Sequence, residues 1–515
     1  MSRSILVLGL DGYEPSIAES LLADGRMPNL QALARDSMRC RLDHGEAKRT
    51  GLAWEHFAVG QEPTAYGRHA AVDFQPTTYR VTQEGTKSKP FAADLSKKFL
   101  IFDAPYFDLP AAPNCVGLVG WGAHDAGVAP LCAPPGLSEE VTAKFGPYPA
   151  TPYIYGFVWP NEERTRAMAA ALVEAVERRS VIGHWLCTER LSGWDMAVIV
   201  VSEFHSAVEA LWHGYDATHP LHHLPSAEPA RAGILGVYEA FDRMLGLYRR
   251  SMPDVDIVVF SMHGMGANDS DVATMLLLPE LMYRASFGRG LFEPRPEWRV
   301  AHGSVPLLSQ DEVWDTAVKS CLRHRRRRAG EKLPLDWMPA TAYRRYWPEM
   351  EAFALPSYYD GRIRLSLAGR EHQGRVPAAN YSAKLDELCA LLEECRDPWT
   401  NEPVVRAITR PVAADPLRAG PTEADLVVTW RGSHLAFQHR RLGLIGPAPF
   451  RRTGGHTGST GIAYFSTLRL PLGDIETASA FDIVPTLIDL LDAPRLPYVS
   501  GQSLFDRMAE APAAE

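Results

Sequence analysis

Three short runs of apolar residues, rich in β-branched side chains, predict strands that are buried on both faces. They are Ser4–Leu10 (SILVLGL), Met196–Val201 (MAVIVV) and Ile257–Ser261 (IVVFS). Continuous apolar runs of this length are typical of parallel sheets, because helices cover both faces of such sheets. Each run gives way to glycine or polar residues, as strands do where they leave an open sheet. The pattern therefore predicts an α/β fold around a doubly wound, mostly parallel sheet.

Four longer segments are predicted to be helices that lie before, between and after these strands. They are Ser16–Ala23, Asn161–Arg178, Ala230–Arg250 and Tyr381–Glu394. Helices on both faces of a parallel sheet complete the layers that bury its apolar strands. A last set of strand, loop and helix, from Ala424 to about Leu491, is predicted to rejoin this core.

The chain changes character between Leu277 and Ala414. This stretch holds clusters of proline and tryptophan, a basic run and the sequence GRIRLSLAGREHQGRV. We interpret it as a segment that is inserted into the core and forms a cap over the sheet. The predicted domains are a catalytic core of residues 1–276 and 415–510, an insertion or cap of residues 277–414, and a disordered tail of residues 511–515.

The overall composition indicates a large globular protein that does not bind nucleic acid. The chain has 515 residues, 46% of them hydrophobic, which suffices for a large core. A net charge of −9 argues against a nucleic-acid backbone as the main partner. One basic run, from Arg323 to Arg328, has two interpretations. It is either a phosphate-binding patch or the solvated face of an inserted segment.

Nothing in the sequence predicts export or membrane insertion. The apolar start of the chain spans only about seven residues and meets Asp11 without a small-residue cleavage site. No window approaches the roughly 18 uncharged apolar residues that a membrane span needs. The seven cysteines are scattered, odd in number and without a CxxC pair. A reduced, cytoplasmic protein is therefore expected.

Side chains with metal-binding or catalytic chemistry follow directly after the predicted strands. In an open α/β sheet, ligands bind outside the carboxyl ends of the strands. Asp11, Glu203, His205 and His263 all lie just past those ends. The strand pattern alone therefore predicts a polar site at this edge of the sheet.

Taken singly, these candidate residues each allow two interpretations. Asp11 is either a metal ligand or a turn-forming carboxylate beside a glycine. Thr50, in KRTGLAWEHF, is either a helix N-cap or a hydroxyl nucleophile, which needs a metal or a base to ionise it at neutral pH. His205 and Glu209 are four residues apart, so on a helix they share one face. They either grip one cation or form a surface pair.

Two further histidines stand in glycine-rich segments, where the backbone can approach a ligand closely. They are His263 in SMHGMG and His456 in RTGGHTGSTG. These and four other segments resemble, in their order along the chain, the motifs of the alkaline phosphatase superfamily. The likeness is to its type I phosphodiesterase/nucleotide pyrophosphatase-like family. The other segments are LVLGLDGYEPSIAESLLADGRMPNLQALA, TGLAWEHFAVGQEPTAYG, SEFHSAVEALWHGYDATHP and SAFDIVPTLIDLLDAPRLPYVSGQSL.

The resemblance spans most of the predicted core, leaves the insertion least matched, and implies an alkaline phosphatase-like fold. It also implies a site for one or two divalent metal ions, with zinc expected first and manganese or iron as alternatives. Residues around the metal that activates the nucleophile would be Asp11, Thr50 and His263. Residues around the second metal would be His205, Glu209 and His456.

The chain departs from the pattern of this family at three positions. Met262 stands where the family has an aspartate ligand, and a thioether is a poor ligand for a hard or borderline cation. His205 replaces an aspartate and Glu209 replaces a histidine, so two histidines and one carboxylate remain, a set that suits zinc or iron. The site on the nucleophile side is therefore expected to be weak, empty or dependent on added metal. Three carboxylates are alternative sources of the missing oxygen ligand: Glu203, Asp269 and Asp271.

The function that the resemblance implies is metal-dependent hydrolysis, or a related group transfer, at a phosphate ester or diester. Thr50 would be the nucleophile and would carry a covalent intermediate. The alternative is a catalytically silent or repurposed member that binds a phosphorylated metabolite or a partner, because Met262 replaces a metal ligand. The sequence leaves open the physiological substrate, phosphate against sulfate, and whether the protein forms a homo-oligomer.

The inserted segment carries four arginines within fourteen residues. If they clamp a small anionic substrate by forked hydrogen bonds, the protein is an enzyme dedicated to one metabolite. If their alternation marks the solvent face of a strand, they have no such role. The four are Arg362, Arg364, Arg370 and Arg375.

Overall fold

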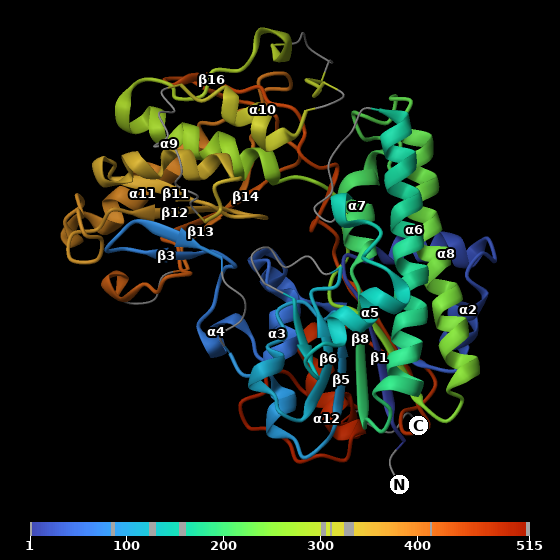
Figure 1. Cartoon of the computed structure of the whole chain (residues 1–515). Helices are drawn as coiled ribbons and strands as arrows, with labels where there is room; N and C mark the ends of the chain where they lie inside the picture. The colour runs from blue at the N-terminus through green and yellow to red at the C-terminus, as the bar shows by residue number, and fades with distance from the viewer. Residues whose placement is uncertain are drawn as a thin grey trace.

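The computed structural model of the chain describes residues 3–83, 88–122, 130–153, 161–299, 305–309, 312–323, 334–411 and 415–510. These residues form two packed regions, each built on its own sheet (Figure 1). We call the part around the larger sheet the core region and the part around the smaller sheet the cap region. Of the basic run, only Arg323 belongs to the described residues, and the predicted tail of residues 511–515 lies outside them.

The larger sheet contains ten strands among the described residues. Their bounds are β1 Ile5–Leu10, β2 Met38–Asp43, β5 Phe99–Phe102, β6 Cys115–Val119, β7 Leu131–Ala133, β8 Met196–Val201, β9 Asp256–Ser261, β18 Gly461–Ser466, β19 Gly473–Asp474 and β20 Ala478–Ser479. Their order is β19-β2-β18-β9-β1-β8-β5-β6-β7, with β20 also beside β2. The central strands β1, β8, β9, β5 and β6 pair in parallel, and β18 runs antiparallel to β9. The predicted mostly parallel α/β sheet is confirmed.

Helices cover both faces of this sheet, which explains why its central strands β1, β8 and β9 are buried at every position. One face packs against α1 (Pro15–Ala23), α2 (Pro28–Arg35), α6 (Glu162–Trp185), α7 (Glu203–Tyr215) and α8 (Ala227–Ser251), and the other against α3 (Ala53–Val59) and α12 (Ile483–Leu490) (Figure 1). In β1, Leu6, Leu8 and Leu10 join the first layer, whereas Ile5 and Val7 join the second. Successive side chains of a strand point to opposite faces of the sheet. Because helices cover both faces here, the side chains on both faces are apolar.

The predicted strands and helices of the core region agree with the structure. The three apolar runs are β1, β8 and β9, and the first three predicted helices are α1, α6 and α8. Helix α6 continues to Trp185, beyond the predicted end at Arg178. The added segment, about two turns long, buries Ile182 and Trp185 against the sheet, so tertiary packing extends the helix.

The cap region is built on a four-stranded antiparallel sheet with its own hydrophobic cluster. The strands are β11 Ala352–Leu355, β12 Gly361–Leu365, β13 Val405–Thr409 and β14 Leu426–Trp430, in the order β11-β12-β14-β13. Helices α9 (Leu278–Phe287) and α11 (Tyr381–Glu393) pack on it. The cluster includes the buried side chains of Trp298, Trp314, Trp347 and Trp430. The first three belong to the insertion and contribute to its tryptophan-rich composition.

The cap region takes in more of the chain than the predicted range 277–414. Strand β14 belongs to its sheet, and its hydrophobic cluster continues to Phe450. A hairpin of β3 (Asp73–Gln75) and β4 (Arg80–Thr82) from the N-terminal part contributes Phe74 and Val81 to the same cluster. The predicted return to the core at residue 415 is therefore too early, and the chain rejoins the larger sheet only at β18.

No helix in the described part of the chain is long and apolar enough to cross a membrane. All seven cysteines are free thiols. Burial raises the pKa of Cys40, Cys115, Cys187 and Cys395 to about 12. These four thiols stay protonated at neutral pH, so they are not nucleophiles.

Candidate metal centre

Turns at the carboxyl edge of the larger sheet carry the candidate residues. Asp11 follows β1, His205 and Glu209 lie on α7 just after β8, and His263 follows β9. These three strands are parallel neighbours, so their ends meet at one edge of the sheet. Strand β18 is antiparallel to β9, so the loop that leads into it returns to the same edge. This loop carries His456.

His205, Glu209 and His456 form a buried cluster whose side chains can share one metal ion. Their potential ligand atoms all lie within 4.8 Å of one another. Nε2 of His205 is 3.0 Å from Nε2 of His456 and 3.1 Å from Oε1 of Glu209. Neighbouring ligands of a tetrahedral zinc ion, with bonds of about 2.0–2.1 Å, are about 3.3 Å apart. The cluster therefore already has nearly the spacing of a zinc ligand set, and two imidazoles with one carboxylate are a donor set of catalytic zinc sites.

The electrostatics of the cluster shift the pKa values of its two imidazoles in opposite directions. Burial lowers the pKa of His456 far below its ordinary value, and the adjacent His263 and His205 add to the shift. Burial opposes the charged form of His205 as well, but Glu209 and Asp11 outweigh this effect and raise the pKa of that ring. His456 is thus neutral at pH 7, which is the form that metal binding needs.

Asp11 lies beside His205 but outside the cluster. Its Oδ2 lies 3.7 Å from Nδ1 of His205, and burial raises the pKa of its carboxyl. Because Nδ1 faces this carboxylate, Nε2 is the nitrogen directed at Glu209 and His456. Ligating histidines in metal sites commonly have a carboxylate in this position.

A glycine allows the turn after β1, which carries Asp11, to lie close to helix α7, which carries His205. Gly12 has a φ of 72°, and a Cβ atom at this position would lie 2.4 Å from Cα of His205. Any other residue here would push the turn away from the helix and move Asp11 off His205.

Arg452 provides the counter-charge of the cluster, and sequence analysis did not single it out. Its Nη1 contacts Oε1 of Glu209, while its Nε and Nη2 donate to Asp271 at 2.7 and 3.0 Å. Arg451 donates to the same Asp271 carboxylate at 2.9 Å. All of these side chains are buried. Asp271 is therefore engaged by two guanidinium groups and does not replace the ligand that Met262 lacks.

Glu203 is also engaged away from the cluster. It forms a two-pronged ion pair with Arg179, with Nε and Nη2 at 2.9 and 2.8 Å, and Arg179 also binds Asp103 at 2.8 Å. All three side chains are completely buried. Glu203 is the first residue of α7, so this closed triad fixes the start of the helix that carries His205. The third alternative ligand, Asp269, interacts electrostatically with Arg49 and Arg406, and burial raises its pKa to about 6.

Thr50 lies at the end of the 3-10 turn Gly45–Thr50. Its Oγ1 donates to the carbonyl of Ala47 at 2.8 Å and accepts from the N–H of Leu52 at 3.2 Å. The N-cap of α3 is Leu52, so Thr50 is not the helix cap that one interpretation expected. Thr50 lines a cavity of about 1060 Å³ between the two regions, with Thr477 and Phe481 of the core region and Arg362 and Arg406 of the cap region also in its wall. His205, Glu209 and His456 are not among the described residues that line it.

Tyr359 of the cap region connects Thr50's turn to the histidine cluster. Its ring stacks on His456, with the centroids 3.8 Å apart and an interplanar angle of 20°. The same ring lies 3.4 Å from the position of a Cβ at Gly51, the residue after Thr50. Nη1 of Arg49 donates to the Tyr359 carbonyl at 3.2 Å. One tyrosine therefore touches a candidate ligand and the neighbour of the candidate nucleophile.

Histidines, rather than carboxylates, surround Met262. Nε2 of His44 lies 3.1 Å from Nδ1 of His56, and both rings line a small cavity together with Met262. The ring of His44 lies parallel to that of His263, with centroids 5.9 Å apart. Burial lowers the pKa of His56 to about 3 and that of His263 to about 4. The predicted site on the nucleophile side therefore has neutral rings where its second carboxylate would be.

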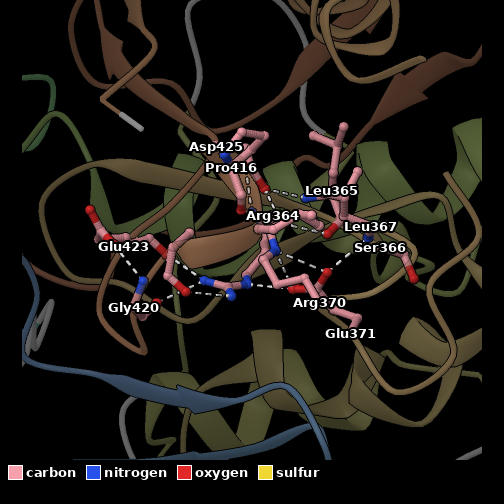
Figure 2. A network of polar contacts seen from close by, with 12 residues as sticks. Arg364, Leu365, Ser366, Leu367, Arg370, Glu371, Pro416, Gly420, Glu423 and Asp425 are labelled. Atoms are coloured by element: carbon pink, nitrogen blue, oxygen red, sulfur yellow. Dashed lines mark hydrogen bonds and ion pairs between the residues drawn. The ribbon is translucent and has the colours of Figure 1, made fainter. Parts of the chain in front are cut away.

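Two of the arginines that were candidates for substrate binding belong to a closed network inside the cap region (Figure 2). Arg364 pairs with Glu371 at 2.7 Å and donates to backbone carbonyls at 2.9 and 3.1 Å. Arg370 pairs with Asp425 at 2.6 and 2.8 Å and with Glu371 at 2.9 Å. Their side chains are 0% and 3% exposed. For these two, a substrate clamp and a solvent face are both wrong, because the nearby Glu371 and the distant Asp425 neutralise them inside the cap region.

The other two arginines of that segment are placed differently. Arg362 pairs with Asp360 at 2.9 and 3.0 Å and lines the large cavity, so it remains a candidate for contact with a substrate. Arg375 is exposed and donates to the carbonyl of Pro348 at 2.7 Å.

Sequence reasoning missed Arg452, Tyr359, His44 and His56. The arginine had a visible signal, because the pair Arg451-Arg452 stands just before the glycine-rich loop of His456. His44 lies six residues before Thr50, close enough to have been examined with it. Tyr359 had no signal, because only the folding of the cap region brings it to the core region.

No protein-family model matches the chain, and no curated protein matches it in sequence. Solved structures match it in fold. Murine ectonucleotide pyrophosphatase/phosphodiesterase 5 has a TM-score of 0.50 and 11% identity, with 98% of each chain covered. Phosphonoacetate hydrolase from Sinorhizobium meliloti 1021, in complex with phosphonoformate, has a TM-score of 0.47 and 15% identity, with 95% of each chain covered. The likeness to the murine protein concerns the fold, and it confirms the predicted alkaline phosphatase-like architecture.

Proposed function

We propose, with the alkaline phosphatase-like fold of this chain as the premise, that it is a metal-dependent hydrolase of a small phosphate ester or diester. The observation that carries the proposal is the buried cluster of His205, Glu209 and His456, whose ligand atoms lie within 4.8 Å of one another. Its donor set suits zinc, with manganese and iron as alternatives. The cluster lies at the edge of the sheet where ligands bind in open α/β folds.

The three side chains of the cluster would hold one ion, and their neighbours would keep them in place. A bound ion of this kind stabilises negative charge on a transferring phosphoryl group and lowers the pKa of an oxygen ligand. Asp11 lies beside Nδ1 of His205, and Arg452 contacts the same Glu209 oxygen that faces Nε2 of His205. Met262 offers no oxygen, so we propose a single ion at this centre rather than a pair.

Thr50 is the proposed nucleophile. Its Oγ1 would give up the hydrogen bond to Ala47 and form a bond to phosphorus while the bond from phosphorus to the leaving oxygen breaks. The hydroxyl proton would pass through solvent to the leaving oxygen, which departs as an alcohol. Water would then attack phosphorus, restore the threonine hydroxyl, and release phosphate from a monoester or a phosphate monoester from a diester. The position of Thr50 on the wall of the 1060 Å³ cavity supports this role, because a substrate in the cavity can reach the hydroxyl.

A second candidate function is binding without catalysis, with a phosphorylated metabolite or a partner as the ligand. The contact of Arg452 with Glu209 favours it, because a guanidinium already balances the charge that would attract a metal. The two functions predict different metal contents for the purified protein.

We further propose a cytoplasmic location, which the seven free cysteines support.

The experiment that tests the hydrolase compares wild type with Thr50→Ala and Thr64→Ala. Thr64 lines the same cavity but is exposed, so it controls for the loss of a hydroxyl there. Metal content is measured by mass spectrometry, and turnover is measured with chromogenic phosphate monoesters, diesters and a sulfate ester, with zinc, manganese or iron added. We expect about one transition metal per chain in all three proteins, and turnover lost only in Thr50→Ala.

An acid quench during turnover adds a direct readout, because it should trap a phosphoryl group on Thr50. Wild type that holds no metal after gentle purification and turns over none of the esters would support binding without catalysis. Full turnover in Thr50→Ala would refute the covalent route alone.

A further inference from the structure

A small cavity next to the candidate centre combines two histidines with a methionine. His44, His56 and Met262 line it, and the rest of the described wall is glycine and apolar side chains. Its volume is about 10 Å³, which is room for one water-sized guest. The three residues are 2%, 1% and 5% exposed. No carboxylate is found among the described residues of this wall.

The two histidines of this cavity leave ring nitrogens without partners. Nε2 of His44 and Nδ1 of His56 are 3.1 Å apart, so one ring donates its proton to the other. The remaining nitrogens, Nδ1 of His44 and Nε2 of His56, are buried and have no hydrogen-bond partner. Whichever ring donates, its second nitrogen is left with a free lone pair. A buried lone pair without a partner is costly, so a guest that can accept it is favoured.

This arrangement matches the way in which histidines bind metals. A ligating imidazole commonly donates its other N–H to a second group, which fixes the tautomer and the ring orientation. Here the second group is the other histidine of the pair. The lone pair that remains is an uncharged, borderline donor, and Sδ of Met262 is an uncharged, soft donor.

We propose that this cavity is a binding site for one soft monovalent metal ion, copper(I) in the first place, held by an imidazole nitrogen of the His44–His56 pair and Sδ of Met262. Thioether and imidazole donors select copper(I), whereas magnesium, calcium and manganese require oxygen ligands, which this wall lacks. A single positive charge also costs less to bury among neutral ligands than a double charge does. Met262 thus offers a soft sulfur donor at the position where the resembling family has a hard carboxylate ligand.

The site shares no side chain with the three proposed zinc ligands, although His44 and Phe481 also line the 1060 Å³ cavity that holds Thr50. His44 stacks against His263 at 5.9 Å, and His263 contacts His456 at 4.6 Å between ring centroids. None of the three side chains that would hold zinc lines the small cavity. Failure of the hydrolase proposal therefore does not decide this one.

The test follows the methyl resonances of the methionines by NMR during titration with silver(I), a redox-stable probe for copper(I). The chain has 14 methionines, and the resonance of Met262 is assigned by its loss in Met262→Leu. Thiols also bind soft ions, so the titration uses a Cys132→Ser/Cys389→Ser background, which removes the two cysteines that are not fully buried. Met275→Leu is the matched control, because Met275 is fully buried in the cap region.

We expect the Met262 resonance to shift and to saturate with one bound ion, in wild type and in Met275→Leu alike. Anaerobic competition for copper(I) should show affinity weakened at least about tenfold in Met262→Leu and in His56→Phe, the scale on which losses around a metal site act. Both leucine substitutions conserve volume, so the fold is retained. A Met262 resonance that does not move, or copper(I) bound as tightly by Met262→Leu as by wild type, would overturn the proposal and leave the cavity to water.

Discussion

The candidate metal centre and the arginine network of the cap region both bury several charged side chains, but they are satisfied in different ways. In the cap region, Arg364 and Arg370 face Glu371 and Asp425, and the remaining guanidinium N–H groups reach backbone carbonyls (Figure 2). In the centre, two imidazoles direct nitrogens at each other over 3.0 Å, and only one of them can supply a proton to that contact.

This difference distinguishes polar groups that are buried to stabilise the fold from polar groups that are buried to bind a ligand. A closed network has a donor for every acceptor, so an added ligand gains nothing there. A cluster in which lone pairs converge is stabilised by a cation. The number of buried charges is similar in both places, so it is the direction of the lone pairs that identifies the centre.

The largest effect is expected where the cap network is broken. Arg370→Met leaves Asp425 and Glu371 buried with less counter-charge, which should lower the free energy of unfolding of the cap region by about 3–5 kcal/mol. Urea denaturation followed by tryptophan fluorescence measures the change, because Trp314, Trp347 and Trp430 lie in this region. Metal content of the folded protein should stay the same.

Arg375→Ala is the control for that experiment, since this arginine is exposed and makes one hydrogen bond to a carbonyl. Its stability should remain within about 0.5 kcal/mol of wild type. Equal losses in the two variants would show that the network is not what holds the cap region together.

The opposite pattern is expected at the centre. His456→Ala removes one of the three proposed ligands, so the affinity for zinc should fall by at least about a hundredfold, roughly 2.7 kcal/mol. Stability without metal should change little or rise, because a buried imidazole is lost. Isothermal titration with zinc, alongside thermal unfolding in a chelator, measures both quantities. His372→Ala, which removes an exposed histidine, should bind zinc like wild type.

A smaller effect is expected where the two regions meet. Tyr359→Ala removes the ring that stacks on His456, so affinity for zinc should weaken by about tenfold, as for other groups that orient a ligand. Tyr359→Phe keeps the ring and should bind zinc within about twofold of wild type. If phenylalanine loses as much as alanine, the hydroxyl and not the stacking supports the centre.

The local sequence pattern was enough to predict the strands and helices of the core region and the pairing of His205 with Glu209 in the candidate metal centre. The apolar runs of β1, β8 and β9 are buried on both faces, and that burial is a property each strand displays along its own length. The i,i+4 spacing of His205 and Glu209 on a helix is equally local. Because parallel strands end at one edge, the strand assignments also placed Asp11, His205 and His263 near one another.

Only the tertiary structure decided which polar residues face a ligand and which face each other. Arg364 and Arg370 look like a clamp in sequence, but Asp425 reaches them from 55 residues beyond Arg370 and closes the network. The placement of Tyr359 on His456 and of His44 and His56 around Met262 arises in the same way, from chain segments that fold back over long distances. Periodicity records whether a side chain is buried, whereas the partner that makes burial favourable is chosen by long-range packing, which no local pattern contains.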